Sequence, residues 1–175
     1  MPSPRAFFMR GSSLDADEPR LDDLYREVVL DHYRSPRGRD PVAHPDVVNI
    51  GLNPLCGDEV TVSLKFEGGR VSGVQAASLG CSISVASGSM MAELLKGKTR
   101  EEVMRLLETF RSMMHGDAAP VGAELGDLEA LQGVRKYPVR IKCALLPWMT
   151  LKDALEGGAG KPTTTDGDDS PGRLE

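Results

Sequence analysis

A run of alternating apolar and polar residues constrains the fold of this chain more than any other feature. Residues 60–66 (VTVSLKF) alternate with period two, a turn with two glycines occupies residues 67–70, and residues 71–79 resume a less regular extended run. This pattern predicts a β-hairpin with a tight turn at its tip. Cys56 lies just before the first strand and Cys81 just after the second. Antiparallel strands return to where they began, so the hairpin alone can bring these two thiols near each other.

Apolar residues recur at helical spacing both before and after the hairpin. This spacing predicts a helix over residues 21–34 and two more over residues 82–96 and 100–114. Residues 37–55 hold several glycines and prolines, and we expect them to form an extended, loop-like connection. The expected N-cap of the helix over residues 82–96 is Ser82 or Ser84. The helix over residues 100–114 is expected to begin with a capping box formed by Thr99 and Glu102.

The C-terminal third of the folded region has weaker signals. Asp127 can cap a short helix over residues 128–132. Residues 137–143 are expected to be an extended segment that places Cys143 just ahead of a last helix. Pro147 suits the first turn of that helix, because the first helical residues have no intrahelical use for their N–H groups. All three cysteines of the chain are thus expected at turns or at junctions between elements.

Length and composition predict one globular domain. The chain has 175 residues, 40% of them hydrophobic and 27% charged, which suffices for a real core. We expect this domain to span residues 20–157, with disordered segments over residues 1–19 and 158–175. The net charge of −5 gives no excess of positive charge that would attract nucleic acid. No apolar run approaches the roughly 20 residues that span a bilayer. The sequence therefore indicates a cytoplasmic protein that binds neither nucleic acid nor membrane.

Three cysteines cannot form a complete set of disulfides within one chain, so other roles come into question. Each can be a buried small hydrophobe, a metal ligand or a nucleophile. Cys56 and Asp58 share one turn, and together with Cys81 and Cys143 they could supply the four ligands of a tetrahedral zinc ion. Their spacing is not a specific motif, since the sequence contains no C-x-x-C.

Three segments, in this order, carry a resemblance to a known family. Residues 25–37 (YREVVLDHYRSPR), 53–58 (NPLCGD) and 80–84 (GCSIS) resemble the IscU/NifU N-terminal family of iron–sulfur cluster assembly proteins. The similarity covers about residues 21–157 and is greatest to the SufU branch. Scaffold-type members have a histidine where this chain has Lys142, and residues near 115–135 look like an insertion typical of SufU-type members.

The resemblance implies an α+β fold in which a small antiparallel sheet is packed against several helices. It implies zinc held by Cys56, Asp58, Cys81 and Cys143, with Cys56 as the thiol that accepts sulfur. The donor implied is a persulfide on a SufS-type cysteine desulfurase, and downstream Suf-type assembly machinery would receive the sulfur. Asp58 would hold the metal or assist the exchange, and Arg140 matches a position associated with docking or activity.

Other functions remain open on the sequence. The same four residues could hold a [2Fe–2S] cluster as an assembly scaffold, although Lys142 departs from the scaffold pattern. They could also form a structural zinc module without a reaction. A Cys/His hydrolase is disfavoured, because no motif pairs His32, His44 or His115 with a nucleophile. His32 is expected to be a packing or capping residue, and the methionines at helical spacing are expected to pack in the core.

Overall fold

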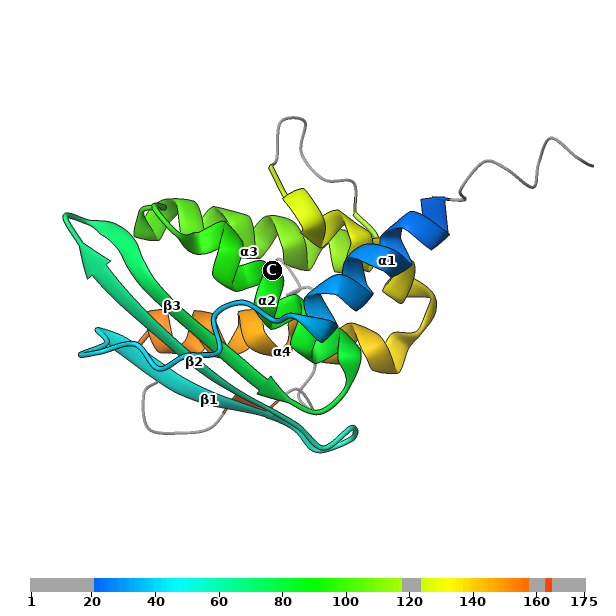
Figure 1. Cartoon of the computed structure of the whole chain (residues 1–175), viewed down its shortest axis with the longest axis horizontal. Coiled ribbons are helices and arrows are strands. Elements are labelled where there is room, and N and C mark those ends of the chain that lie inside the picture. Colours follow the sequence, from blue (N-terminus) through cyan, green and yellow to red (C-terminus); the bar gives the residue numbers. More distant parts are fainter. Residues whose placement is uncertain (1–20, 118–123, 158–162, 165–175) are drawn as a thin grey trace, which may run out of the picture.

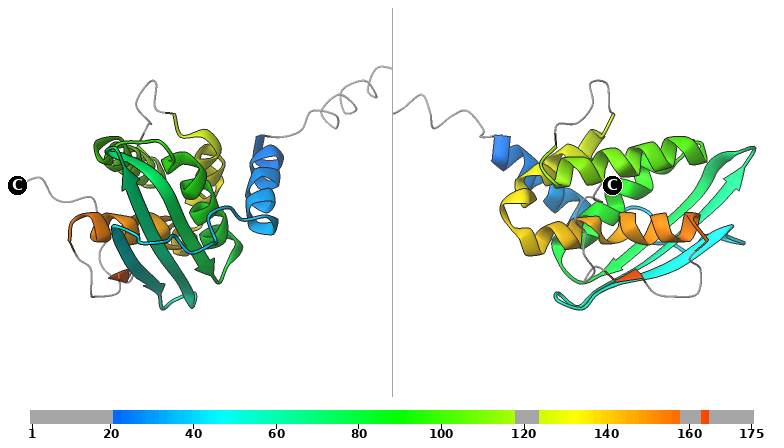
Figure 2. Two further views of the ribbon diagram at one scale, coloured as in Figure 1. Left: turned by 60° about the vertical axis from the view of Figure 1, so that its left-hand side comes forward. Right: turned by 180° about the vertical axis from the view of Figure 1, so that it is seen from behind.

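The chain forms one mixed sheet covered on one face by helices, as the computed structural model in Figure 1 and Figure 2 shows. The structure describes residues 21–117, 124–157 and 163–164. The sheet order is β3-β2-β1-β4, and the predicted α+β class is confirmed. The disorder predicted for residues 1–19 and for most of 158–175 lies outside the described residues. Within that second range, Thr163–Thr164 forms the short strand β4, parallel to β1.

The predicted hairpin is present as β2 (Asp58–Glu67) and β3 (Arg70–Leu79). Gly68 and Gly69 turn the chain with φ of +58° and +76°, values that favour glycine. An additional strand, β1 (Val47–Asn53), pairs antiparallel with β2 inside the segment expected to be loop-like. The sequence does not predict this strand because its burial is the reverse of the usual pattern. Apolar Val48 and Ile50 are exposed, whereas polar Asn49 and Asn53 are buried.

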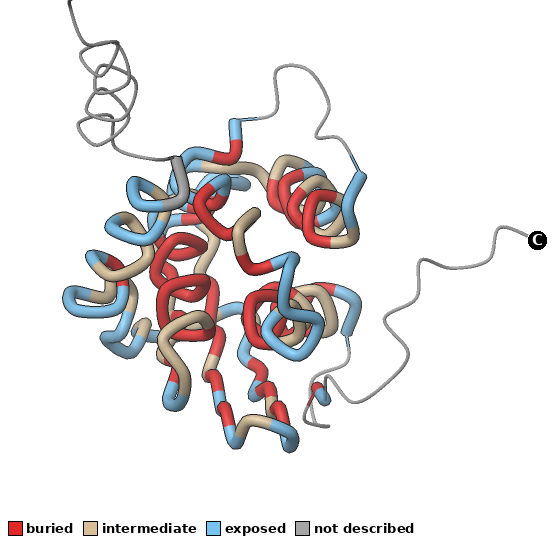
Figure 3. The backbone as a smooth tube through the Cα atoms, turned by 90° about the vertical axis from the view of Figure 1, so that its right-hand side faces the viewer, coloured by how far each residue is buried: buried red, intermediate tan, exposed pale blue. Residues whose placement is uncertain are grey.

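The helices are α1 (Leu21–Arg34), α2 (Ser82–Leu95), α3 (Arg100–Met114) and α4 (Pro138–Leu155), together with the 3₁₀ helix η2 (Gly126–Lys136). Helix α2 is the centre of the domain: it packs on α1, α4 and β3, and ten of its 14 residues are buried. Figure 3 colours the described residues by burial and shows buried residues on several of the helices and along the strands. The capping box of Thr99 and Glu102 is confirmed. The cap predicted for α2 is wrong, since Cys81 occupies the N-cap position without a side-chain capping bond. Helix η2 is longer than the short helix predicted there.

The extended segment predicted over residues 137–143 is also wrong. Only Tyr137 is extended, with φ −122° and ψ 91°, and Pro138 begins α4 at the position where proline fits a helix. Cys143 therefore lies in the second turn of this helix and is fully buried. Pro147 is inside α4, so the carbonyl of Cys143, four residues earlier, lacks its usual helical partner.

The core lies between the sheet and the helices. Trp148 of α4 and Phe110 of α3 are fully buried, with ring centroids 5.2 Å apart. Ser87 of α2 accepts a hydrogen bond from the indole N–H of Trp148 at 3.2 Å and donates to the carbonyl of Ala144 at 2.6 Å. These bonds fix α4 against α2. Four of the methionines predicted to pack in the core are buried there: Met90, Met91, Met113 and Met114.

Among the helices of the described residues, none has the length and apolar character that crossing a membrane would require.

Candidate metal centre

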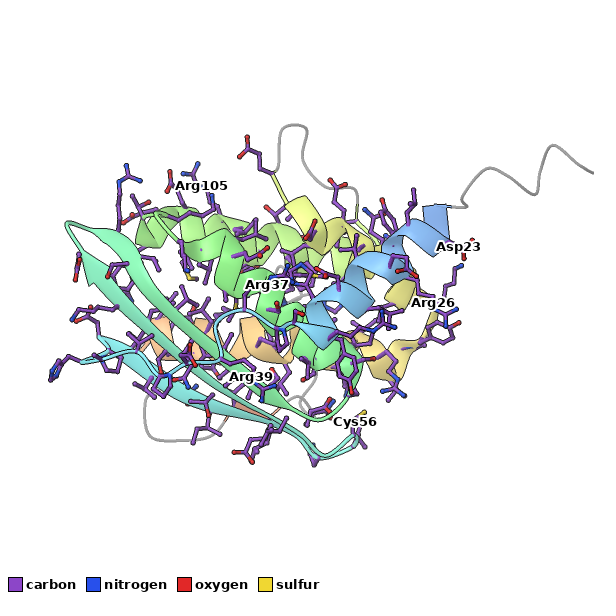
Figure 4. All side chains as sticks on the ribbon, viewed as in Figure 1. Asp23, Arg26, Arg37, Arg39, Cys56 and Arg105 are labelled. Atoms are coloured by element: carbon purple, nitrogen blue, oxygen red, sulfur yellow. The ribbon has the colours of Figure 1, made fainter. Side chains whose placement is uncertain are left out.

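Four side chains of metal-binding type meet at one end of the sheet, and they come from separate parts of the chain. Cys56 lies in the turn between β1 and β2, as labelled in Figure 4, and Asp58 begins β2. Cys81 follows β3 and precedes α2, and Cys143 comes from α4. The structure thus brings together the four residues selected from the sequence. We call Cys56, Asp58, Cys81 and Cys143 the thiol cluster.

Two close contacts define the thiol cluster. The Sγ atoms of Cys143 and Cys56 are 3.4 Å apart, and the Sγ of Cys81 is 3.5 Å from Asp58 Oδ2. Ligand atoms of Cys56, Asp58 and Cys143 all lie within 4.8 Å of one another. Cys81 stands outside that tightest group, because it contacts Asp58 and Cys143 rather than Cys56. A shared ion would have to draw Cys56 and Cys81 together.

The donor set fits a tetrahedral zinc ion. Zinc binds thiolate sulfur at about 2.3 Å and carboxylate oxygen at about 2.0–2.2 Å. A tetrahedron with these bonds places two sulfurs about 3.8 Å apart, and a sulfur and an oxygen about 3.6 Å apart. The observed separations of 3.4 Å between two sulfurs and 3.5 Å between sulfur and oxygen are close to these edges. The side chains therefore need only small movements to surround one ion.

Asp58 is held rigidly although it begins a strand. Its side chain is buried, and its Oδ1 accepts the backbone N–H of Cys81 at 2.8 Å, which leaves Oδ2 facing the thiols. Gly80 makes this approach possible. Its φ of +135° is a conformation that side chains disfavour, and a Cβ built on it would overlap Asp58 Oδ1. The role of Gly80 cannot be predicted from its local sequence, because it depends on a neighbour 22 residues away.

The thiols differ in their electrostatic surroundings. The pKa of Cys81 is lowered to about 6, chiefly because the thiol of Cys143 donates a hydrogen bond to it. The backbone N–H groups of Ser84 and Ile83, in the first turn of α2, lower the Cys81 pKa further, against the opposing effects of burial and Asp58. The pKa of Cys143 is raised, because its proton bonds the Cys81 sulfur and because the thiol is buried.

Arg140 lies at the rim of the thiol cluster. Its guanidinium is exposed, one turn before Cys143 on α4. The charge of Cys81 and a hydrogen bond to the Cys81 sulfur raise the pKa of Arg140, and the charge of Cys143 adds to the effect. The position selected from the sequence therefore puts a permanent positive charge beside two of the thiols.

Asn53 is a residue of the site that sequence reasoning passed over. It belongs to the segment predicted to be loop-like, yet it ends β1, is buried, and donates from Nδ2 to the Sγ of Cys143 at 3.5 Å. Its only sequence signal was its place in the NPLCGD segment beside Cys56.

A second group of metal-binding type lies elsewhere, between α1, α2 and η2. Ligand atoms of its three members also lie within 4.8 Å of one another. His32 is fully buried: its Nε2 donates to Asp127 Oδ2 at 2.8 Å, and its Nδ1 is 2.7 Å from the Oγ of Ser89. Arg37 reaches the third member, Glu93, with Nε 2.9 Å from Oε1. We call His32, Glu93 and Asp127 the histidine cluster.

The α+β fold, with three thiols and one carboxylate at the end of its sheet, is that of a domain whose side chains are placed to hold a metal ion, and comparisons with known proteins identify its family. The family described as the NifU-like N terminal domain matches residues 24–144. The chain is 43% identical over 141 residues to the zinc-dependent sulfurtransferase SufU of Bacillus subtilis (strain 168), covering 79% of this chain and 95% of that protein. It is 38% identical over 147 residues to the iron–sulfur cluster assembly scaffold protein IscU of Streptococcus pyogenes serotype M1, covering 84% and 92%.

A solved structure shows the same architecture. The crystal structure of a protein described as an iron–sulfur cluster assembly scaffold for the SUF system, from Fervidobacterium islandicum AW-1, superposes with a TM-score of 0.69. It is 34% identical to this chain and covers 74% of it, and 94% of that protein is matched. The chain belongs to the IscU/NifU family of NifU-like N-terminal domains, and the resemblance predicted from the sequence is confirmed.

Proposed function

We propose that this protein acts in iron–sulfur cluster assembly as a zinc-dependent sulfur acceptor. It takes sulfur from the persulfide of a SufS-type cysteine desulfurase and passes it to Suf-type assembly machinery. One observation carries the proposal: three thiols and a buried carboxylate converge at one end of the sheet, with one thiol, Cys56, on a half-exposed turn. The SufU relative, whose name states zinc dependence and sulfur transfer, supports it.

The proposed zinc ligands are Cys56, Asp58, Cys81 and Cys143. Bound zinc would keep its cysteine ligands deprotonated at neutral pH, and a thiolate is the form of cysteine that attacks sulfur. Cys143 is buried within α4, and Cys81 is held by the first turn of α2. Cys56 is the thiol that can reach out, because its turn projects from the sheet (Figure 4).

The transfer is a thiol exchange that needs no external oxidant or reductant. The Cys56 thiolate attacks the outer sulfur of the donor's persulfide, and a new S–S bond forms on Cys56. The S–S bond of the donor breaks, and the donor cysteine leaves as a thiolate with the electron pair of that bond. Asp58 retains its position beside Cys81 during the exchange, since its Oδ1 is bonded to the backbone. Arg140 adds a positive charge at the rim, which favours the approach of an anionic persulfide.

The surroundings of the thiol cluster suit a protein donor. Leu55, Leu79 and Val139 are each more than half exposed, and each lies one to four residues from a cysteine of the cluster. Exposed apolar side chains gathered at one place are typical of protein contact surfaces. A cavity of about 500 Å³ between α1, η2 and the start of α2 includes Ser82 and Ile83, the residues that follow Cys81. A docked partner would exclude water from the exchanging sulfurs.

We propose residues 20–157 as the complete functional unit and the cytoplasm as its compartment. The three cysteines are free in the structure. A reducing compartment keeps such thiols available for sulfur transfer and metal binding.

A second candidate is a scaffold that assembles a [2Fe–2S] cluster on the same four residues. It is favoured by the names of the IscU relative and of the structural neighbour, both described as scaffolds. Cysteine thiolates ligate such clusters as readily as they ligate zinc. Lys142 stands next to Cys143 where scaffold-type members carry a histidine, which favours the first candidate.

One experiment separates these functions. The protein is purified without added iron, its metal is measured, and alanine release is followed after addition of the desulfurase and cysteine. One zinc per chain with accelerated alanine release supports the sulfur acceptor, and Cys56→Ala should abolish the acceleration. Stable cluster absorbance without acceleration would instead establish the scaffold. Zinc without acceleration would leave a structural zinc module. Ser72→Ala, on the exposed part of β3, is a control that should behave as wild type.

A further inference from the structure

Asn53 connects the turn that carries Cys56 to the helix that carries Cys143. Its backbone carbonyl accepts the N–H groups of Cys56 at 3.2 Å and Gly57 at 2.8 Å. Its side-chain Oδ1 accepts the N–H of Leu55 at 3.2 Å. Because that N–H must meet an oxygen, the atom that faces Cys143 Sγ at 3.5 Å is the amide nitrogen, a hydrogen-bond donor.

We propose that Asn53 is a positioning residue that keeps Cys143 on the metal and so determines which thiolate leaves it. The inference rests on the proposed function. An N–H donor stabilises a thiolate and holds its orientation, and such partners of metal ligands strongly affect metal affinity. Asn53 is only 1% exposed, so water cannot easily replace its bond to Cys143.

The three sulfurs differ in their N–H donors. Cys143 has the side-chain amide of Asn53, Cys81 has backbone amides at the start of α2, and the guanidinium of Arg140 at the exposed rim bonds both of these sulfurs. For Cys56, the contact found within the described part of the chain is the Cys143 thiol, and no N–H group donates to its sulfur. Two thiolates are thus anchored by donors that the fold supplies, and the third is not. This asymmetry releases Cys56 first, whereas Asn53 and α2 retain the other two sulfurs.

The chain offers a matched control on the same strand. Asn49 is also buried on β1, and its side chain also bonds once to the backbone of its own strand, accepting from Ile50 N–H at 2.9 Å. Its Nδ2 donates to Thr150 O at 3.2 Å and Thr163 Oγ1 at 3.0 Å, away from the thiols. Removing either side chain deletes a buried amide from β1, but only one of them bonds a cysteine.

The experiment compares Asn53→Ala and Asn49→Ala with wild type, each loaded with one zinc per chain. A limiting amount of iodoacetamide is added, and mass spectrometry quantifies the labelling of each cysteine. In wild type, Cys56 should react first and Cys143 last. In Asn53→Ala, labelling of Cys143 should rise at least about tenfold relative to Cys81, and zinc transfer to a chelator should accelerate roughly 10–100-fold. Asn49→Ala should keep the wild-type order.

Three results would overturn the inference. One is that Cys143 stays as protected in Asn53→Ala as in wild type. Another is that all three cysteines gain reactivity equally, which would mean general loosening. The third is that Asn49→Ala exposes Cys143 to the same degree. If Asn53→Ala does not fold, Asn53→Leu fills the same space without a donor and faces the same criteria. No sulfur donor takes part, so the outcome is separate from that of the desulfurase assay; a wild type that binds no zinc would instead reject the proposed function itself.

Discussion

The thiol cluster and the histidine cluster are alike in their geometry and differ in their internal partners. Both gather metal-binding side chains from separate elements, and each contains ligand atoms within 4.8 Å of one another. In the histidine cluster the ligand atoms already have partners that fix them: Nε2 of His32 bonds Asp127, Nδ1 bonds Ser89, and Arg37 pairs with Glu93. In the thiol cluster, Asp58 Oδ2 and the sulfur of Cys56 meet thiol groups of the same cluster.

The difference lies in whether a cation of the protein already occupies the cluster. The guanidinium of Arg37 occupies the place of a cation: its Nε is 2.9 Å from Glu93, and its Nη1 is 3.2 Å from His32 Nδ1. A divalent ion there would have to displace this charge or accept its repulsion. At the thiol cluster the positive charge of Arg140 acts on Cys81 and Cys143 from the exposed rim. The space between the four side chains holds no such cation among the described residues, and a metal ion there would supply the counter-charge for deprotonated thiols.

The first and largest prediction is that zinc binds only at the thiol cluster. Cys143→Ala removes a buried ligand, so zinc affinity should fall by more than the roughly 10–100-fold that loss of a ligand's hydrogen-bond partner costs. The double variant Glu93→Gln with Asp127→Asn should retain one zinc per chain with wild-type affinity. Elemental analysis and competition with a chromophoric chelator measure both. Two zinc ions per wild-type chain, or loss of zinc from the double variant, would contradict the distinction between the clusters.

The second prediction is that the histidine cluster contributes to folding stability. His32→Ala leaves a cavity and removes one of the two hydrogen-bond partners of buried Ser89, which keeps only the backbone N–H of Arg37, and this should lower the free energy of unfolding by about 3 kcal/mol. Glu93→Gln changes an exposed ion pair and should cost less than about 1 kcal/mol. Urea denaturation of metal-free protein gives both values. A His32 variant as stable as wild type would remove the structural role assigned to this cluster.

The third prediction concerns the glycines that flank the thiol cluster. Gly80→Ala should lower stability by about 2 kcal/mol and zinc affinity by about tenfold, because the added Cβ displaces Asp58. Gly57→Ala meets no neighbour within 4 Å and has only the strain of φ +70°, about 1 kcal/mol. Thermal unfolding with and without zinc measures each contribution. Equal zinc affinities for the two variants would show that Asp58 tolerates the displacement.

The two clusters also show how far sequence reasoning reached. Local signals predicted the β2–β3 hairpin, α1 and the capping box of α3, because each depends on residues close in sequence. The ligand set of the thiol cluster came from a resemblance that covered whole motifs. The sequence does not predict that Cys143 lies in a helix, because Pro138 and Pro147 flank it. Proline is disfavoured in the interior of a helix, yet Pro147 lies inside α4. The histidine cluster joins residues up to 95 positions apart, and no local pattern reveals such a contact.

The smallest effect is expected at the start of α3, outside both clusters. Thr99→Ala removes the hydroxyl that accepts the N–H of Glu102, so the free energy of unfolding should fall by about 1 kcal/mol while zinc affinity is unchanged.

The other half of the capping box is sensitive to pH. The backbone N–H of Thr99 bonds the Glu102 carboxylate and lowers its pKa. The carboxylate therefore stabilises the fold above its ordinary pKa, and this contribution is lost as pH falls through the lowered value. Thr99→Ala keeps the backbone N–H and should keep this pH dependence, whereas Glu102→Gln should remove it. Urea titrations at several acidic pH values distinguish the two variants, and parallel curves for both would show that the carboxylate is not stabilised by the cap.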